Sequence, residues 1–149
     1  MVDREALIEE IELFEKLDIK YLLEELEKSS SVQCSNPSQE PIVLDEEMVE
    51  LISQSLIMLI EEDEAFAQAV EEALIKVDKR NKVADITIVG VAIGSGVTLL
   101  ICLLKKRDSG GGNVYGAMQN DGEIDYHLHI DDMDREEFKE ILKECINES

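Results

Sequence analysis

The stretch ITIVGVAIGSGVTLLICLL, residues Ile86–Leu104, decides the fold, because its 19 residues include no charged side chain. Asp85 precedes it, and Lys105, Lys106 and Arg107 follow it. As a helix it spans about 28 Å at 1.5 Å per residue, close to the hydrocarbon thickness of a bilayer. The pattern therefore predicts a single-pass membrane protein, placed in the inner membrane, with the lipid bilayer as a partner and Lys105, Lys106 and Arg107 as a basic membrane flank.

Small residues recur at four-residue spacing within this stretch. Gly90 and Gly94 form one such pair, and Ala92 and Gly96 form another. Pairs of this kind allow two membrane helices to approach closely. We therefore expect these four residues to mediate helix association and to make the protein a homo-oligomer.

The same stretch has an alternative interpretation as the buried core of a soluble, cytoplasmic protein. If Gly94-Ser95-Gly96 is a turn, a buried β-branched strand covers 86–93 and a helix covers 97–107. One continuous buried helix or strand is also an option, although 19 residues is long for either in a domain this small.

The chain before this stretch has a helical pattern with acidic outer faces. Residues 1–28 carry apolar side chains three and four apart and predict one amphipathic helix. Residues 29–44 begin with Ser, Asn, Gln and Pro and read as a linker. Residues 45–83 predict a further helical region, in which Asp45 opens one helix and Asp63 caps the next.

The chain after the apolar stretch, residues 108–149, predicts a ββα module. The hairpin turns at Asn120-Asp121-Gly122, and Asp134 with Glu137 marks the start of a last helix. The apolar stripe of that helix (Phe138, Ile141, Leu142 and Cys145) is expected to cover the hairpin. The predicted fold class is therefore mostly α with a small β-hairpin (α+β): acidic N-terminal helices, one apolar transmembrane helix with its flank at 84–107, and the C-terminal unit.

The composition limits the classes of partner. The chain has 35 Asp and Glu against 14 Lys and Arg, a formal net charge of -21. A phosphate backbone needs a basic face, so we expect no nucleic acid partner. The three cysteines are scattered through the sequence and are typical of a reducing compartment rather than of a disulfide framework.

The strongest candidates for metal chemistry are His127, His129 and Asp131. Alternate residues of a strand point the same way, as metal ligands must. The chain has only two histidines, however, so a solvated polar face is the simpler interpretation. We find no pattern for catalytic or cofactor-binding residues, and a metal-dependent enzyme is kept only as a further hypothesis.

A family resemblance rests on the segments Ala92-Ile93-Gly94-Ser95-Gly96, Leu99–Leu104 and Lys105-Lys106-Arg107, the turn Asp121-Gly122 and the helix from Asp134. In these features, residues 84–147 resemble the effector-associated constant component family of bacterial conflict systems. The resemblance implies a non-enzymatic component of a defence or programmed-death pathway whose partner is a conflict-system effector. It supplies no catalytic residues.

Two function classes follow from the sequence. The first is a non-enzymatic, single-pass membrane component or adaptor that acts by helix association and partner binding. The alternative is a soluble, acidic α+β adaptor with residues 86–104 as buried core, which binds a basic partner through its acidic surfaces.

Overall fold

The computed structural model describes residues 2–29, 42–78, 92–93, 99–101, 103–104 and 135–147, and this part of the chain is mostly helical. The named elements in chain order are α1 (Arg4–Glu12), α2 (Lys16–Ser29), β1 (Ile42–Val43), α3 (Glu46–Glu62), α4 (Glu64–Asp78), β2 (Ala92–Ile93) and α7 (Arg135–Asn147). The mostly helical class is confirmed. The predicted hairpin at 114–130 lies outside the described residues.

The predicted single-pass, inner-membrane localisation is wrong. In the described ranges, no helix combines the length and the apolar character needed to cross a bilayer. The one continuous helix expected over 86–104 is also wrong, because Ala92 and Ile93 form the strand β2 whereas residues 99–101 and 103–104 are helical. A β-branched residue such as Ile93 favours a strand over a helix, in line with its place in β2.

The described helical residues of the apolar segment belong to the folded core, and its strand β2 joins them to the N-terminal half. β2 pairs antiparallel with β1, with Ile42 opposite Ile93 and Val43 opposite Ala92. The helical residues that follow are all at most 1% exposed: Leu99, Leu100, Ile101, Leu103 and Leu104. A helix that is apolar on every side needs apolar surroundings on every side. Here the surrounding helices supply those surroundings, in line with the alternative interpretation of the sequence.

The single N-terminal helix predicted for residues 1–28 is in fact two helices. α1 ends at Glu12, where the N–H of Leu13 bonds the carbonyl oxygens of Glu10 and Ile11. α2 begins at Lys16, and the Asp18 carboxylate accepts the N–H of Glu15 at 2.9 Å. This contact is one half of a capping box, which stabilises a new helix start without glycine or proline.

The linker predicted for 29–44 does not remain a linker at its end. Its last residues form β1 and then lead into α3, and Ile42 and Leu44 are buried in the core. Residues 30–41 lie outside the described part of the chain. The apolar pair on either side of the exposed Val43 is the feature that fixes this strand to the core.

The predicted capping roles of Asp45 and Asp63 are confirmed. Asp45 accepts the N–H of Met48 at 2.7 Å, and Asp63 accepts the N–H of Phe66 at 3.2 Å. Each carboxylate satisfies one of the backbone donors that a helix start leaves unpaired. The two aspartates therefore set the starts of α3 and α4, and with them the sharp turn between these helices.

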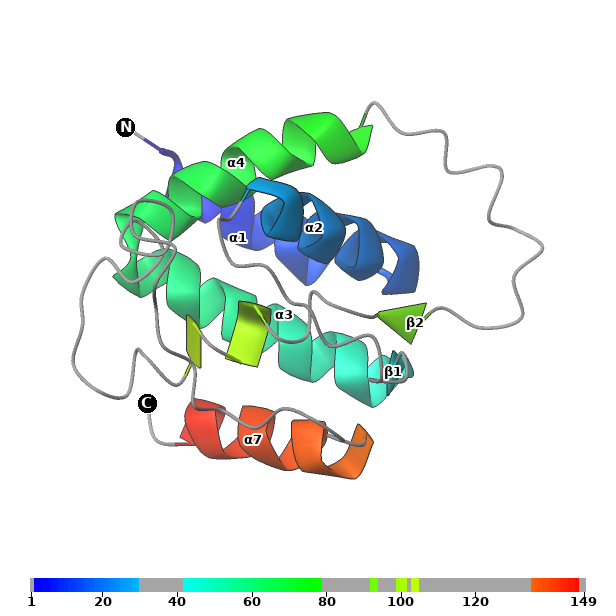
Figure 1. Cartoon of the computed structure of the whole chain (residues 1–149). Helices are drawn as coiled ribbons and strands as arrows, with labels where there is room; N and C mark the ends of the chain where they lie inside the picture. Colours follow the sequence, from blue (N-terminus) through cyan, green and yellow to red (C-terminus); the bar gives the residue numbers. More distant parts are fainter. Residues whose placement is uncertain are drawn as a thin grey trace.

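α3 is the central helix of the described structure. It packs against α1, α2 and α4, and α7 lies against its other side (Figure 1). The predicted stripe of α7 is buried through Phe138, Leu142 and Cys145. Among the described elements its partner is α3, and the hairpin that the sequence predicted as its partner lies outside the described residues. The acidic N-terminal half and the C-terminal helix thus share one core.

Candidate partner-binding surface

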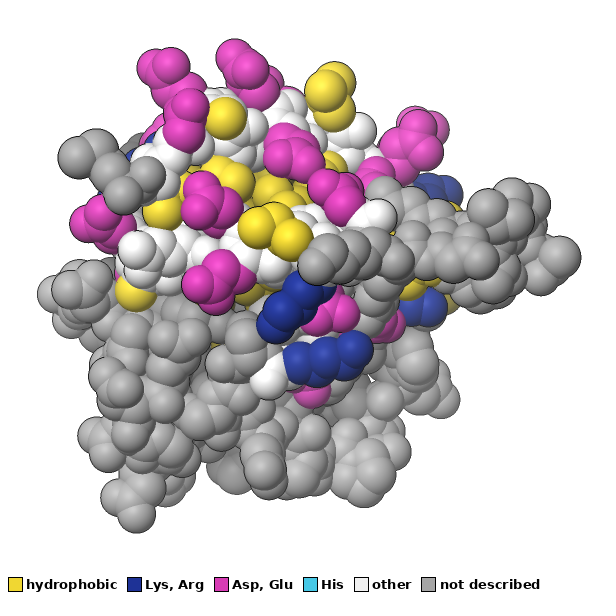
Figure 2. All heavy atoms as spheres, turned by 90° about the horizontal axis from the view of Figure 1, so that it is seen from above, with side chains coloured by type: hydrophobic (Ala, Val, Ile, Leu, Met, Phe, Trp, Pro, Cys, Tyr) yellow, Lys and Arg dark blue, Asp and Glu magenta, His cyan; other side chains and the backbone are white. Residues whose placement is uncertain are grey.

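The helices α1 to α4 carry a large excess of acidic side chains. Residues 2–29 and 42–78 together contain 21 Asp and Glu but only five Lys and Arg. On the described part of the face in Figure 2, acidic side chains predominate, with apolar side chains visible between them and a few basic ones at the edge of that part. Of these acids only Glu25 and Asp63 are buried, so most of the negative charge lies on the outside of the described structure. Such a surface attracts cationic partners and repels anionic ones.

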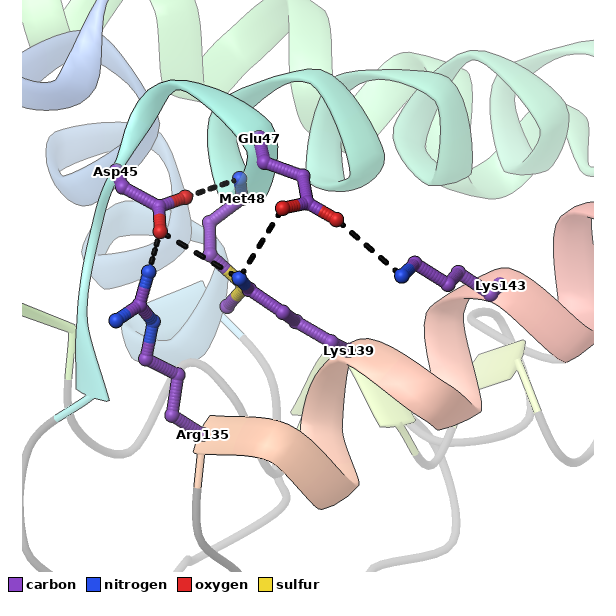
Figure 3. A network of polar contacts seen from close by, with 6 residues as sticks. All are labelled: Asp45, Glu47, Met48, Arg135, Lys139 and Lys143. Atoms are coloured by element: carbon purple, nitrogen blue, oxygen red, sulfur yellow. Dashed lines mark hydrogen bonds and ion pairs between the residues drawn. The ribbon is translucent and has the colours of Figure 1, made fainter.

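The chain itself shows how a helix with one basic stripe docks on one of these acidic helices, although α7 as a whole carries four glutamates against three cations. Arg135 and Lys139 of α7 both form ion pairs with Asp45, and the Lys139 Nζ lies 3.5 Å from its Oδ2. Lys139 and Lys143 approach the two oxygens of Glu47 at 3.3 and 3.2 Å (Figure 3). The three cations are spaced four residues apart and therefore lie on one stripe of α7.

Burial makes Lys139 the central member of this network. Its side chain is only 11% exposed, whereas those of Asp45 and Glu47 remain partly in water. The hydrogen bond from Lys143, followed by that from Lys139, lowers the pKa of Glu47 below its ordinary value. The charged form of Glu47 is therefore favoured, and this is the form that pairs with Lys139 and Lys143 of α7.

A groove lies between the corner that joins α1 to α2 and the start of α3. Its volume is about 460 Å³, and it is lined by Phe14, Glu15, Lys16, Leu17, Glu46 and Val49. The three apolar side chains among these are only half-buried. Leu13, directly before Phe14, is 82% exposed and is one of three exposed large apolar residues in the described structure. An open apolar groove with charged groups at its edge is typical of a binding site.

The residues proposed from sequence for helix association are mostly outside the described part of the chain. Gly90, Gly94 and Gly96 lie outside it, and Ala92 lies in β2. Ala92 therefore cannot contribute to a stripe of small residues along a helix, as the sequence predicted, because it lies in a strand. Lys105, Lys106 and Arg107 also lie outside the described residues, and their predicted role as a membrane flank depended on the localisation that is corrected above.

The metal candidates His127, His129 and Asp131 lie outside the described residues as well. Within the described ranges, no group of three or more His, Cys, Asp or Glu side chains is placed to hold a metal ion. The metal-dependent enzyme hypothesis stays an untested prediction.

Sequence reasoning missed both the ion-pair network and the groove. A signal for the network was present, because cations four residues apart on a short amphipathic helix favour an acidic partner helix. No comparable signal marked the groove, since Phe14 and Val49 meet only after α1 and α3 pack.

The comparisons with known proteins give no further guidance. The chain matches no protein-family model, no curated protein and no solved structure. The class of protein is therefore defined by its fold and surface alone: a mostly helical protein whose N-terminal helices carry an acidic surface.

Proposed function

We propose that this protein is a non-enzymatic adaptor that binds a basic partner protein through the acidic surface of α1 to α4. One observation carries the proposal: residues 2–29 and 42–78, which form these helices, contain 21 acidic residues and only five basic ones. A protein that carries such a field destabilises its own compact state by self-repulsion. A cationic partner would relieve that repulsion, and long-range attraction would speed its association.

The structure offers support in the form of a precedent within the chain. α7 shows that the first turn of α3 accepts a helix with an apolar stripe and cations at its side. The burial of Leu99, Leu100 and Ile101 also supports the proposal, because it gives the apolar segment a structural role in the core. The acidic surface is then the feature left to explain.

The family resemblance of residues 84–147 suggests a class of partner within this proposal. A conflict-system effector with a basic surface would fit both the resemblance and the charge of α1 to α4. Self-association is a separate prediction from the sequence, and it is opposed by the like charge of two copies of the same acidic surface.

A direct test uses a defined probe in place of the unknown partner. The full chain is titrated with a synthetic amphipathic helix that has a leucine stripe flanked by lysines, and binding is followed by fluorescence anisotropy. We expect binding that weakens at least several-fold between about 0.05 and 0.3 M salt, since surface attraction is screened over a shorter distance at the higher salt. The matched control peptide has glutamates in place of the lysines and should bind far more weakly.

Charge-reversal variants show whether the acidic surface is responsible. Glu9→Lys on α1 and Glu71→Lys with Glu72→Lys on α4 change exposed residues and should weaken binding of the lysine peptide several-fold. The corresponding glutamine variants should have intermediate affinity. If the lysine and glutamate peptides bind equally well, or if neither binds, the proposed function is wrong.

A further inference from the structure

We propose that the groove between the α1–α2 corner and α3 is the docking site for an amphipathic helix of the partner, which inserts an apolar side chain and places cations at the groove's edge. This inference rests on the proposed function and adds to it the location of the site and the form of the partner. It is argued from the shape of the groove, its charge and the way α7 binds to α3.

The groove exists because α1 and α2 are two helices. The chain turns between Leu13 and Glu15, and the turn brings Phe14 and Leu17 opposite Val49 of α3. Phe14 and Val49 are partly buried and pack against the hydrophobic core, so the core holds the floor of the groove in place. The volume of about 460 Å³ lies within the usual range of about 300–1,000 Å³ for ligand pockets.

Leu13 is an exposed apolar residue at the same corner, directly before Phe14 in the chain, although it does not line the groove. Its neighbour Phe14 lines the groove, whereas Leu13 itself is 82% exposed and therefore extends into solvent. A single exposed leucine is ordinary on a protein surface. Next to an open apolar groove, however, it enlarges the apolar surface that a partner would cover, and covering that surface is favourable.

The charge around the groove specifies a cationic occupant. Residues 9–18, which form the corner, carry five acids and the single base Lys16, and residues 45–50 on the other wall carry four acids and no base. Glu15 and Glu46 lie in the lining itself together with Lys16, so acids outnumber bases there by two to one. On the second wall, Asp45 and Glu47 pair with α7. Glu46, in the same first turn of α3, lines the groove instead, and its carboxylate is the acidic group on that wall.

The same charge argues against the other classes of occupant. A second copy of this chain would bring another acidic surface to an acidic groove, and nucleotides or phosphates would be repelled in the same way. α7 shows the favoured arrangement: an apolar stripe that contacts α3, with Arg135, Lys139 and Lys143 beside it. A partner helix with this pattern fits an apolar groove whose edge is acidic.

The experiment compares variants of two exposed apolar residues. Leu13→Ser changes the residue beside the groove, and Ile75→Ser changes an exposed residue of α4 that does not line it. Both side chains lie largely in water, so both variants are expected to fold. We expect Leu13→Ser to weaken binding of the leucine-and-lysine peptide about tenfold, and Ile75→Ser to leave it within about twofold.

Two further measurements locate the peptide and test the charge. Methyl NMR of the full chain should show peptide-induced shifts at Leu13, Leu17 and Val49, with little change at Ile75. Glu46→Gln should weaken binding several-fold and reduce its salt dependence, because it removes a carboxylate at the groove.

The outcomes separate this inference from the proposed function. If the peptide binds with the expected salt dependence but Leu13→Ser, Glu46→Gln and the methyl signals of the groove do not respond, the docking site is wrong and the proposed function stands. If the peptide does not bind at all, both are overturned. If the NMR signals of the groove residues shift when the protein concentration alone is raised, a second copy of the chain occupies the groove. That outcome would overturn the inference.

Discussion

At the scale of single residues, Asp45 joins the start of a helix to the packing of another. One of its carboxylate oxygens accepts the N–H of Met48 and caps α3, and the other forms the ion pairs with Arg135 and Lys139. A carboxylate has enough lone pairs for both tasks. Because the two contacts use different oxygens, substitutions can separate them.

We predict that Asp45→Ala lowers the free energy of unfolding by about 1–2 kcal/mol relative to wild type, because it removes the cap of α3 as well as the ion pairs. Asp45→Asn keeps a good capping residue and should lose only about 0.5–1 kcal/mol from the missing charge. Urea unfolding followed by circular dichroism measures both. Asp3 provides the control, since its side chain caps α1 through Ala6 and Asp3→Asn should be nearly neutral. Equal losses for Asp45→Asn and Asp45→Ala would contradict this division of roles.

At the scale of elements, α7 is held on α3 by a buried apolar stripe and by cations on its side. Phe138 and Leu142 are fully buried, and Lys139 lies between two carboxylates. The apolar contacts supply most of the attraction, whereas partly exposed ion pairs usually add little and chiefly fix orientation. The charges do, however, make the docking of α7 sensitive to pH.

We predict that the network loses its contribution under acidic conditions. The pKa of Glu47 is lowered by Lys143 and Lys139, so its stabilising effect is present above the ordinary glutamate pKa and is lost as the pH falls through the lowered value. Wild type should therefore be more stable than Glu47→Gln near neutral pH, and the difference should shrink on acidification. Urea unfolding across this pH range measures it.

The control for this prediction is Glu140→Gln, which removes an acid from an exposed position of α7. Its stability relative to wild type should not follow the trend of Glu47→Gln. A constant difference between wild type and Glu47→Gln at all pH values would show that the ion pairs with Lys139 and Lys143 do not form in solution.

The helix starts were predictable from sequence, and the break at Leu13 was not. Asp45 and Asp63 precede apolar stripes, so their capping follows from local chemistry alone. Residues 1–28 keep a nearly continuous helical pattern, but the backbone contacts of Leu13 end α1 and the Asp18 contact to Glu15 starts α2. The free-energy difference between one continuous helix and two capped helices is small, and a periodic pattern of apolar residues does not reveal it. The groove depends on this break and was missed with it.

At the scale of the whole molecule, the described core is built around α3 and the buried residues of the apolar segment. Leu99, Leu100, Ile101, Leu103 and Leu104 are enclosed together with side chains from the N-terminal helices and α7. A segment that is apolar on all sides has the same composition in a protein core as in a bilayer. Composition alone therefore could not decide between the two, and the membrane prediction failed for this reason.

We predict that Ile101→Ala costs about 2–4 kcal/mol of folding free energy, because it leaves a cavity in a closely packed core. The side chain of Ile101 is fully buried. Urea unfolding of the full chain, purified without detergent, gives the measurement. Ile75→Ala is the matched control and should cost less than about 0.5 kcal/mol, as its side chain is 54% exposed. If the two variants lose the same stability, residue 101 is not in the core.

The pairing of β1 with β2 has a consequence for how the chain is made. These strands are about fifty residues apart, and the buried residues after β2 are synthesised later than the four helices that enclose them. At roughly 5–20 residues per second, a ribosome completes α4 a second or more before it adds the apolar residues 99–101 and 103–104, which pack in one core with α1 to α4. During that interval the nascent N-terminal half exposes the surface that later becomes the interior, and a chaperone that shields it would decide how much of the protein reaches its final form.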